Sequence, residues 1–224
     1  MNVLISGVGK GIGRALCEKF LAEGHSVVGT YYSTPKPDYS SPQLTLVQLD
    51  LSNDERVVGA AKEIEKLGVK FDILINNAGA LFDEEETRVV VDKLRKTLEV
   101  NLIGTINFTE QILKLMNNSG HIVNISSSAG SLANSMKGES HFPGHYPAYK
   151  ISKVGLNMYT VILARQLKDK GITVSSVHPG WVRTDMGGQE ADITPEQAAE
   201  DIYKFALTRP ESGHFWHKGE QLPW

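Results

Sequence analysis

Short apolar runs alternate along the chain with longer segments in which apolar residues recur at helical spacing. Each apolar run is bounded by glycine or polar residues, which is typical of strands buried on both faces of a parallel sheet. The intervening segments repeat their apolar residues as an amphipathic helix does. This repeated β–α order predicts an α/β fold built around a parallel sheet. The predicted strands are residues 3–5, 26–31, 44–49, 71–75, 121–125, 172–177 and 213–216.

Helix ends follow from local signals in the same pattern. Ser52 predicts a helix N-terminus, because Glu55 three residues later completes a capping box. Thr194, followed by a proline, predicts another. The acidic run 83–86 is interpreted as the solvated start of a long helix that reaches Ile112, since carboxylates suit a helix N-terminus. The apolar side of the helix over 147–170 is predicted to carry Val154, Met158, Val161, Ile162 and Leu167.

The turn between the first strand and the first helix is rich in glycine. The dinucleotide fingerprint Gly-x-Gly-x-x-Gly would need a glycine where Ile12 stands, and the spacing that fits is Gly7-x-x-x-Gly11-x-Gly13. Such a turn lets the backbone approach a pyrophosphate, and the helix behind it offers free N–H groups. A glycine-rich turn without a ligand is the alternative interpretation.

Three side chains that can act on a carbonyl group follow the fifth predicted strand. Ser127 comes just after that strand, and Tyr149 and Lys153 are four residues apart, so they project from one face of a helix. Because open parallel sheets bind ligands at the carboxyl ends of their strands, the serine can face the other two across the crevice. A hydroxyl, a phenol and an ammonium group converging there can polarise a carbonyl and give it a proton.

Together, these motifs resemble the short-chain dehydrogenase/reductase family. The chain also carries a strand-end Ser127-x-x-Gly130 and the run Asn76-Asn77-Ala78-Gly79. Segment 178–188 and the final Leu-Pro-Trp are most similar to the carbonyl-reductase-like branch that contains sniffer and the bacterial C-factor proteins. The resemblance implies one Rossmann domain over residues 1–224, with a doubly wound, mostly parallel sheet of seven strands flanked by helices.

The resemblance implies a role for each catalytic residue. Tyr149 would be the general acid for reduction of a carbonyl and the base for oxidation of an alcohol. A free tyrosine has a pKa of about 10, and Lys153 is expected to make Tyr149 a better base through its charge, while it holds the nicotinamide ribose. Ser127 would donate to the substrate oxygen. Asn101 would hold a water beside Lys153; a surface or internally satisfied asparagine is the alternative.

The resemblance also implies a cofactor and its binding residues. Tyr31-Tyr32-Ser33 stands where an acidic residue would select NAD, and Lys10 stands where NADP-preferring relatives carry a basic residue. We therefore expect NADP(H), with NAD as the alternative, although Lys10 could be an ordinary solvated lysine and Asp50 could simply end its strand. The implied cofactor-binding residues are Gly7, Lys10, Gly11, Ile12, Gly13, Tyr31, Asp50, Leu51, Asn77, Ala78, Gly79, Tyr149, Lys153, Pro179, Gly180, Val182 and Thr184.

Composition and charge exclude other classes of function. The chain has 224 residues and a formal net charge of −3, which gives no basic footprint for nucleic acid. It has no apolar run long enough to cross a membrane. Cys17 is the single cysteine, interpreted as a small apolar helix residue of a cytoplasmic protein. His141 and His145 have no paired ligands in their segment, so we expect no metal site.

These observations predict an NADP(H)-dependent oxidoreductase that reduces a small ketone, aldehyde or quinone, or oxidises the matching alcohol. The competing hypothesis is a cofactor-binding sensor or signalling protein of the C-factor type with vestigial catalysis. Residues 131–147 are expected to form an exposed loop, which could shape substrate access or alter subunit packing. Family relatives often pair through the helix before Ser127 and the helix that carries Tyr149, so a homodimer is expected, with a monomer as the alternative.

Overall fold

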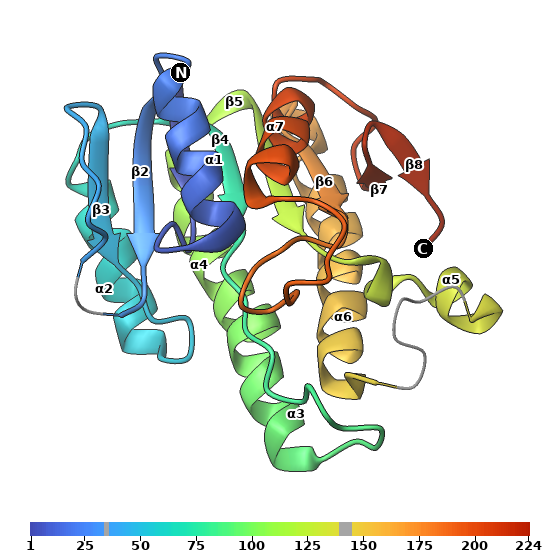
Figure 1. The fold of residues 1–224 in the computed structure, drawn as a ribbon. Helices are drawn as coiled ribbons and strands as arrows, with labels where there is room; N and C mark the ends of the chain where they lie inside the picture. Colours follow the sequence, from blue (N-terminus) through green and yellow to red (C-terminus); the bar gives the residue numbers. More distant parts are fainter. Residues whose placement is uncertain (34–35, 139–144) are drawn as a thin grey trace.

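One eight-stranded sheet forms the centre of the protein (Figure 1). The computed structural model describes residues 1–33, 36–138 and 145–224. The strand order is β3-β2-β1-β4-β5-β6-β7-β8, and all neighbours are parallel except β7 and β8. The predicted α/β class and mostly parallel, doubly wound sheet are confirmed. The strands are β1 (Asn2–Ile5), β2 (Ser26–Tyr31), β3 (Leu44–Gln48), β4 (Phe71–Asn76), β5 (Met116–Ile125), β6 (Thr173–Val177), β7 (His214–His217) and β8 (Glu220–Leu222).

The sheet has one strand more than the seven predicted, so that number was wrong. The additional strand is β8, which is joined to β7 by the turn residues Lys218 and Gly219. Both have positive φ, 49° and 81°, which is the backbone of a two-residue hairpin turn of type I′. Because β8 is three residues long and begins with Glu-Gln, it forms no apolar run that the sequence pattern could reveal.

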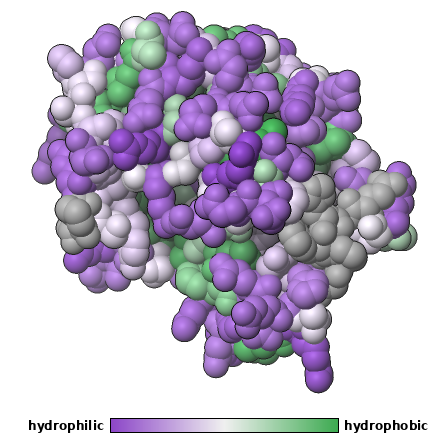
Figure 2. Space-filling model, in the orientation of Figure 1, coloured by the Kyte–Doolittle hydropathy of each residue, from purple (hydrophilic) through white to green (hydrophobic). Residues whose placement is uncertain are grey.

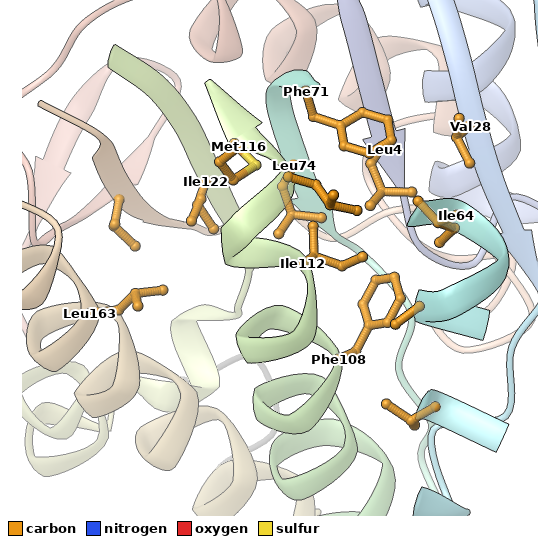
Figure 3. Packing of buried hydrophobic residues seen from close by; sticks show 14 of the residues in the cluster. Leu4, Val28, Ile64, Phe71, Leu74, Phe108, Ile112, Met116, Ile122 and Leu163 are labelled. Atoms are coloured by element: carbon orange, nitrogen blue, oxygen red, sulfur yellow. The ribbon is translucent and has the colours of Figure 1, made fainter. Parts of the chain in front are cut away.

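Helices cover both faces of the sheet (Figure 1). Buried side chains of α1 and α7 pack on one face, and those of α2, α4 and α6 pack on the other. Figure 3 shows the second cluster, in which Phe108 and Ile112 meet Leu4, Leu74 and other strand residues. The helices are α1 (Gly11–Ala22), α2 (Asp54–Glu65), α3 (Val91–Leu98), α4 (Thr105–Ile112), α5 (Leu132–Lys137), α6 (Pro147–Gln166) and α7 (Pro195–Ala206), with the π-helical segment η1 (Glu99–Gly104) and the 3-10 turns η2 (Leu113–Leu115), η3 (Ser128–Gly130) and η4 (Lys168–Lys170).

The long helix predicted from the acidic run to Ile112 has a different form. It begins at Val91 rather than at residues 83–86, and the π-helical segment η1 interrupts it. Asp83 is only 1% exposed, so the interpretation of the acidic run as a solvated helix start was wrong at that residue. A π turn contains one residue more than an α turn, and apolar spacing alone does not show such a local change.

The predicted apolar side of α6 was wrong at two residues, although Leu167 is buried as predicted. Met158 and Ile162 are 59% and 46% exposed, although both were predicted on the apolar side. The buried face contains Leu156, Tyr159 and Leu163 together with buried polar residues such as Thr160. Because that face mixes polar with apolar residues, hydrophobicity alone placed Met158 and Ile162 on the buried side in error.

Two further predictions concern the ends of helices. The N-cap of α2 is Asn53, whose side chain accepts from the backbone N–H of Arg56 at 3.0 Å, so the prediction of Ser52 was wrong by one residue. The capping box of α7 at Thr194 is confirmed. Residues 131–147 are not simply an exposed loop, because the buried Ser131 caps the short helix α5. His141 lies outside the described residues, and His145 is exposed.

No helix in the described ranges combines the length and the apolar character that a membrane span needs.

His121 is a buried titratable residue in β5, 2% exposed. Its Nδ1 lies 3.1 Å from the carbonyl oxygen of Ala206, and its Nε2 lies 3.0 Å from the hydroxyl of Ser175. Since a carbonyl oxygen only accepts, Nδ1 carries the proton and the serine hydroxyl donates to Nε2. Burial lowers the pKa of His121 to about 4, so the folded protein keeps this imidazole neutral.

We expect the protein to lose stability as the pH falls from 7 to 5, because unfolded His121 takes up a proton below about pH 6.5 and the folded form does not. This residue alone should account for roughly 2 kcal/mol of the loss. Urea unfolding at both pH values checks this with His121→Gln, in which the difference between pH 7 and pH 5 should shrink by that amount. His145→Gln, at an exposed histidine, is the control. An unchanged difference in His121→Gln would contradict the assignment.

Candidate active site

The strand order reverses between β1 and β4, and the candidate site lies at the carboxyl ends of these strands, where open α/β sheets form ligand crevices. Ser6 follows β1 and is 2% exposed. Its hydroxyl oxygen accepts from the backbone N–H groups of Asn77 and Ala78, both at 3.0 Å. The Asn77 side chain donates to the carbonyl oxygens of Ser6 and Gly7 at 3.0 and 3.2 Å. These bonds fasten the glycine-rich turn to the Asn-Asn-Ala-Gly run, a role for Ser6 that sequence reasoning missed.

The glycine-rich turn fits a dinucleotide. A Cβ on Gly13 would lie 2.1 Å from the carbonyl oxygen of Gly7 and 2.4 Å from Nδ2 of Asn77, so a side chain at Gly13 has no space. Gly7 and Gly11 have φ of 76° and 56°, which other residues rarely adopt. The first N–H groups of α1 receive no side-chain cap from Lys10. The helix end therefore keeps the donors that a diphosphate needs.

The segment after β6 lies beside this turn. The Cγ2 atom of Thr184 is 3.2 Å from the position of a Cβ on Gly11, so the structure brings Thr184 next to the predicted diphosphate site. Pro179 and Gly180 directly follow β6, and Gly180 has φ of 91°. Val182 is 4% exposed and pairs with Ile193 in an isolated bridge. This bridge holds the segment in place along the crevice.

A pocket of about 350 Å³ opens at the ends of β2 and β3. Asp50, one of the implied cofactor-binding residues, is one of its lining residues. Leu51 is 6% exposed and belongs to the core, so it is not among them, and neither is Tyr31. The full lining is Tyr32, Ser33, Gln48, Asp50 and Arg56.

Sequence reasoning missed Gln48 and Arg56 at this pocket. Gln48 ends β3 and is exposed, and Arg56 lies in the first turn of α2. Their positions in the sequence could have indicated both residues. Each lies close to the carboxyl end of β3, and ligands of open α/β sheets bind at the carboxyl ends of strands. Arg56 brings a positive charge to the pocket, opposite in sign to that of Asp50.

Lys10 projects from the glycine-rich turn as predicted, and it has an ionic partner. Its ammonium lies 2.5 Å from Oδ2 of Asp185, and both side chains are about 80% exposed. An ion pair in such an exposed position contributes little to stability. The Asp185 carboxylate lies in the segment after β6, so this pair joins the two sides of the crevice at the surface.

Ser127, Tyr149 and Lys153 converge, as the sequence predicted. Ser127 caps the turn η3 by accepting from the N–H of Ala129 at 3.2 Å, and hydrogen bonding by its side chain lowers the pKa of Tyr149. The Lys153 ammonium lies 5.4 Å from the centroid of the Tyr149 ring. A Cβ on Gly130 would lie 2.9 Å from the backbone of Lys153, so the absence of a side chain at Gly130 lets η3 pack directly on α6.

Burial controls the protonation of the two titratable groups. It raises the pKa of Tyr149 to about 12, against the opposing effect of the Ser127 hydrogen bond. It lowers the pKa of Lys153 to about 8. Burial sets both directions in the protein alone, and the expectation that Lys153 makes Tyr149 a better base stays a prediction. At neutral pH, Tyr149 carries its proton and most Lys153 side chains remain charged.

Lys153 and Asn101 are both buried and are both held by backbone groups. The Lys153 ammonium donates to the carbonyl oxygen of Ile125 at 2.9 Å. Asn101 accepts from the N–H of Ala80 at 2.7 Å, and it donates to the carbonyl oxygen of Ala80 and to the hydroxyl of Ser152. Both N–H donors of Asn101 thus bind protein groups, which agrees with the alternative interpretation that this asparagine is satisfied inside the protein. A water held beside Lys153 stays a prediction.

Comparison with known proteins decides the family. The model of the short chain dehydrogenase family matches residues 1–195. The chain belongs to this family. It is 30% identical over 231 residues to 1-hydroxy-2-glutathionyl-2-methyl-3-butene dehydrogenase of Rhodococcus sp. (strain AD45), an alignment that covers 100% of this chain and 99% of that protein.

Among solved structures, the short-chain dehydrogenase described here is similar to the carbonyl reductase Sniffer of D. melanogaster, with a TM-score of 0.88 and 25% identity over 100% of this chain and 99% of that one. It is also similar to NADPH-bound carbonyl reductase from chicken fatty liver, with a TM-score of 0.86 and 25% identity over 100% and 94% of the two chains. The predicted family, including its likeness to sniffer, is confirmed. The protein is thus a short-chain oxidoreductase, a family that works with a nicotinamide cofactor.

Proposed function

We propose that this short-chain dehydrogenase is an NADPH-dependent carbonyl reductase that acts on a small ketone, aldehyde or quinone and can oxidise the matching alcohol. The observation that carries the proposal is the convergence of Ser127, Tyr149 and Lys153 beside a turn that fits a dinucleotide. Two similar solved structures are named carbonyl reductases, which supports the same substrate class. We place the protein in the cytoplasm because its one cysteine, Cys17, is a buried thiol and no disulfide supports the fold.

Each catalytic side chain has a distinct task in the proposed reaction. When bound, the reduced nicotinamide would supply the hydride for the carbonyl carbon. Tyr149 donates its phenolic proton to the substrate oxygen, and its raised pKa keeps this proton available at neutral pH. Lys153 stabilises the phenolate that remains, and Ser127 donates a hydrogen bond to the oxygen on which charge develops. The raised pKa of Tyr149 favours reduction over oxidation near pH 7, because oxidation needs the phenolate.

The proposed preference for NADPH rests on charge at the pocket beyond β2 and β3. Tyr32 and Ser33 stand where a carboxylate would repel a 2′-phosphate, and Arg56 adds a positive charge to the lining. Lys10 can contribute as well, although Asp185 already neutralises part of its charge. The chicken carbonyl reductase was solved with NADPH bound, which agrees with this preference.

The proposed function is tested by following NADPH absorbance with a panel of ketones, aldehydes and quinones, with NADH in parallel. We expect oxidation of NADPH with at least one class of carbonyl compound, and slower oxidation of NADH. Tight NADPH binding without turnover on any of them would favour the competing sensor function. Equal rates with the two cofactors would overturn the proposed preference.

We also propose that the protein forms a homodimer through the outer side of α6 and the neighbouring helices. Ile151, Met158 and Ile162 are 42%, 59% and 46% exposed, and their spacing places them on one stripe of the helix. Ile103 in η1 is 47% exposed. Figure 2 shows hydrophobic surface over the region of α3 and α4. Contiguous exposed apolar residues of this kind mark an interface.

Ile162→Glu should convert the dimer to a monomer, because it places a charge in the centre of the proposed interface. Size-exclusion chromatography with light scattering measures the mass of the wild type and the variant. Met136→Glu is the matched control, since Met136 is 88% exposed on α5, outside this stripe. A wild type that is monomeric at high concentration would disprove the proposal.

A further inference from the structure

Asp83 is a buried acidic residue to which the catalytic chemistry gives no role. It follows the Asn-Asn-Ala-Gly run by four residues and is 1% exposed. Glu84 and Glu85 are exposed and Glu86 is half-buried, so Asp83 is the fully buried residue of the acidic run. Its Oδ2 accepts a hydrogen bond of 2.6 Å from the backbone N–H of Ala148. Ala148 directly precedes Tyr149.

The N-terminus of α6 needs such an external partner. A helix normally receives its first cap from the residue just before it, but Tyr146 makes no side-chain cap here and has φ of 57°, a backbone that costs energy in a non-glycine residue. Pro147 has no N–H group to bond. Ala148 therefore presents the first N–H of the helix, and the side chain that binds it is Asp83.

The same loop is joined to α6 at two more points. The N–H of Tyr146 donates to the carbonyl oxygen of Glu86 at 3.2 Å. Further along, Asn101 binds the backbone of Ala80 and also donates to Ser152, whose hydroxyl in turn donates to the carbonyl oxygen of Tyr149 at 2.7 Å. The first turn of α6 is thus fixed from both sides by the loop that starts at the crevice.

The two carboxyl oxygens of Asp83 differ in their partners. Oδ1 is buried and has no hydrogen-bond partner in the ranges that the structure describes. A buried polar atom without a partner costs free energy, so a residue with only a packing role would more favourably be apolar. The bond to Ala148, next to the positive end of a 20-residue helix, is the interaction that offsets this cost.

We propose that Asp83 is a positioning residue for catalysis, which caps α6 from outside the helix and so fixes the Tyr149 hydroxyl relative to Ser127 and the bound substrate. Its effect passes through Ala148 and not through contact with the reacting atoms. Because a displacement of a catalytic group by about 1 Å can cost roughly a hundredfold in rate, loss of this cap should lower kcat by displacing Tyr149. Cofactor binding at the glycine-rich turn should not change.

The test compares Asp83→Ala, Asp83→Asn and the control Glu84→Ala. We expect Asp83→Ala to lower kcat for a carbonyl substrate about tenfold or more, while NADPH affinity stays within about twofold. Asp83→Asn keeps an oxygen acceptor and should recover most of the lost turnover, which a merely destabilising change would not allow. Glu84→Ala should behave as the wild type.

Hydrogen exchange supplies a readout that does not depend on activity. The kinetic part rests on the proposed function, but the amides of residues 146–153 should exchange faster in Asp83→Ala than in the wild type whatever the substrate is. If no carbonyl compound is reduced by the wild type, the proposed function fails and the exchange result still decides on the cap. If Asp83→Ala does not fold, Asp83→Glu, which moves the acceptor by one methylene, should show the same loss of kcat.

Two results would overturn the proposal. One is unchanged exchange at the start of α6 in a folded Asp83→Ala protein. The other is a kcat for Asp83→Asn as low as that for Asp83→Ala, since the acceptor would then have no influence.

Discussion

Tyr149→Phe should lower carbonyl reduction by about a hundred- to ten-thousand-fold, the usual contribution of a general acid. The change removes one hydroxyl group, the one that hydrogen-bonds to Ser127 and lies beside Lys153. Because the pKa of Tyr149 is raised to about 12, its hydroxyl carries the proton at neutral pH and can donate it to the substrate oxygen. Steady-state kcat, together with a fluorescence titration of NADPH, measures the loss and shows that the cofactor still binds.

Tyr159→Phe is the matched control for this experiment. Tyr159 lies on the same helix and is 7% exposed, and its hydroxyl donates to Glu110 at 2.9 Å. Removal of that hydroxyl should affect stability by about 1 kcal/mol and leave kcat near the wild-type value. If Tyr149→Phe turned over as fast as Tyr159→Phe, Tyr149 would not be the acid.

Gly13→Ala should abolish tight cofactor binding. The new Cβ would lie 2.1 Å from the carbonyl oxygen of Gly7. Gly7 has little room to move away, because it packs closely on Ala78: even a Cβ on Gly7 would lie only 2.9 Å from the Ala78 Cα. Overpacking of this kind costs roughly 1–3 kcal/mol. A turn that relaxes to relieve this strain must be restored when NADPH binds, which lowers the affinity by up to about a hundredfold. The dissociation constant for NADPH and the melting temperature together report the effect.

Gly9→Ala provides the control in the same turn. A Cβ on Gly9 would have no atom within 4 Å, and the backbone of Gly9 does not have a positive φ. Its affinity for NADPH should therefore stay close to that of the wild type. An equal loss in Gly9→Ala and Gly13→Ala would mean that the turn as a whole, rather than the contact with Gly7, limits binding.

The sequence was informative wherever a residue type has one strong physical consequence. Gly7, Gly11 and Gly13 predicted a turn with positive φ and close backbone approach, and the structure has both. The spacing of Tyr149 and Lys153 predicted one helical face, and the position of Ser127 just after a strand predicted that it faces them across the crevice. These inferences succeed because local geometry dictates them.

The sequence was uninformative where the answer depended on contacts between distant segments. Asp83 looked like part of a solvated acidic run, and only the folded chain shows that it meets Ala148. Met158 and Ile162 looked like core residues because the true core face of α6 includes polar groups such as Thr160. Arg56 and Gln48 were missed for the same reason, since their pocket forms only when β2 and β3 lie side by side.

The π-helical segment Glu99–Gly104 has a consequence for insertions and deletions. The segment between Val91 and Ile112 has the apolar spacing of one uninterrupted helix, and nothing in that spacing shows that its length matters. A π turn accommodates one extra residue, so loss of one residue there would restore α-helical turns within the segment and change the direction in which its own side chains point. Asn101 would then swing away from Ala80, so the length of this segment is as strictly constrained as the identity of its residues.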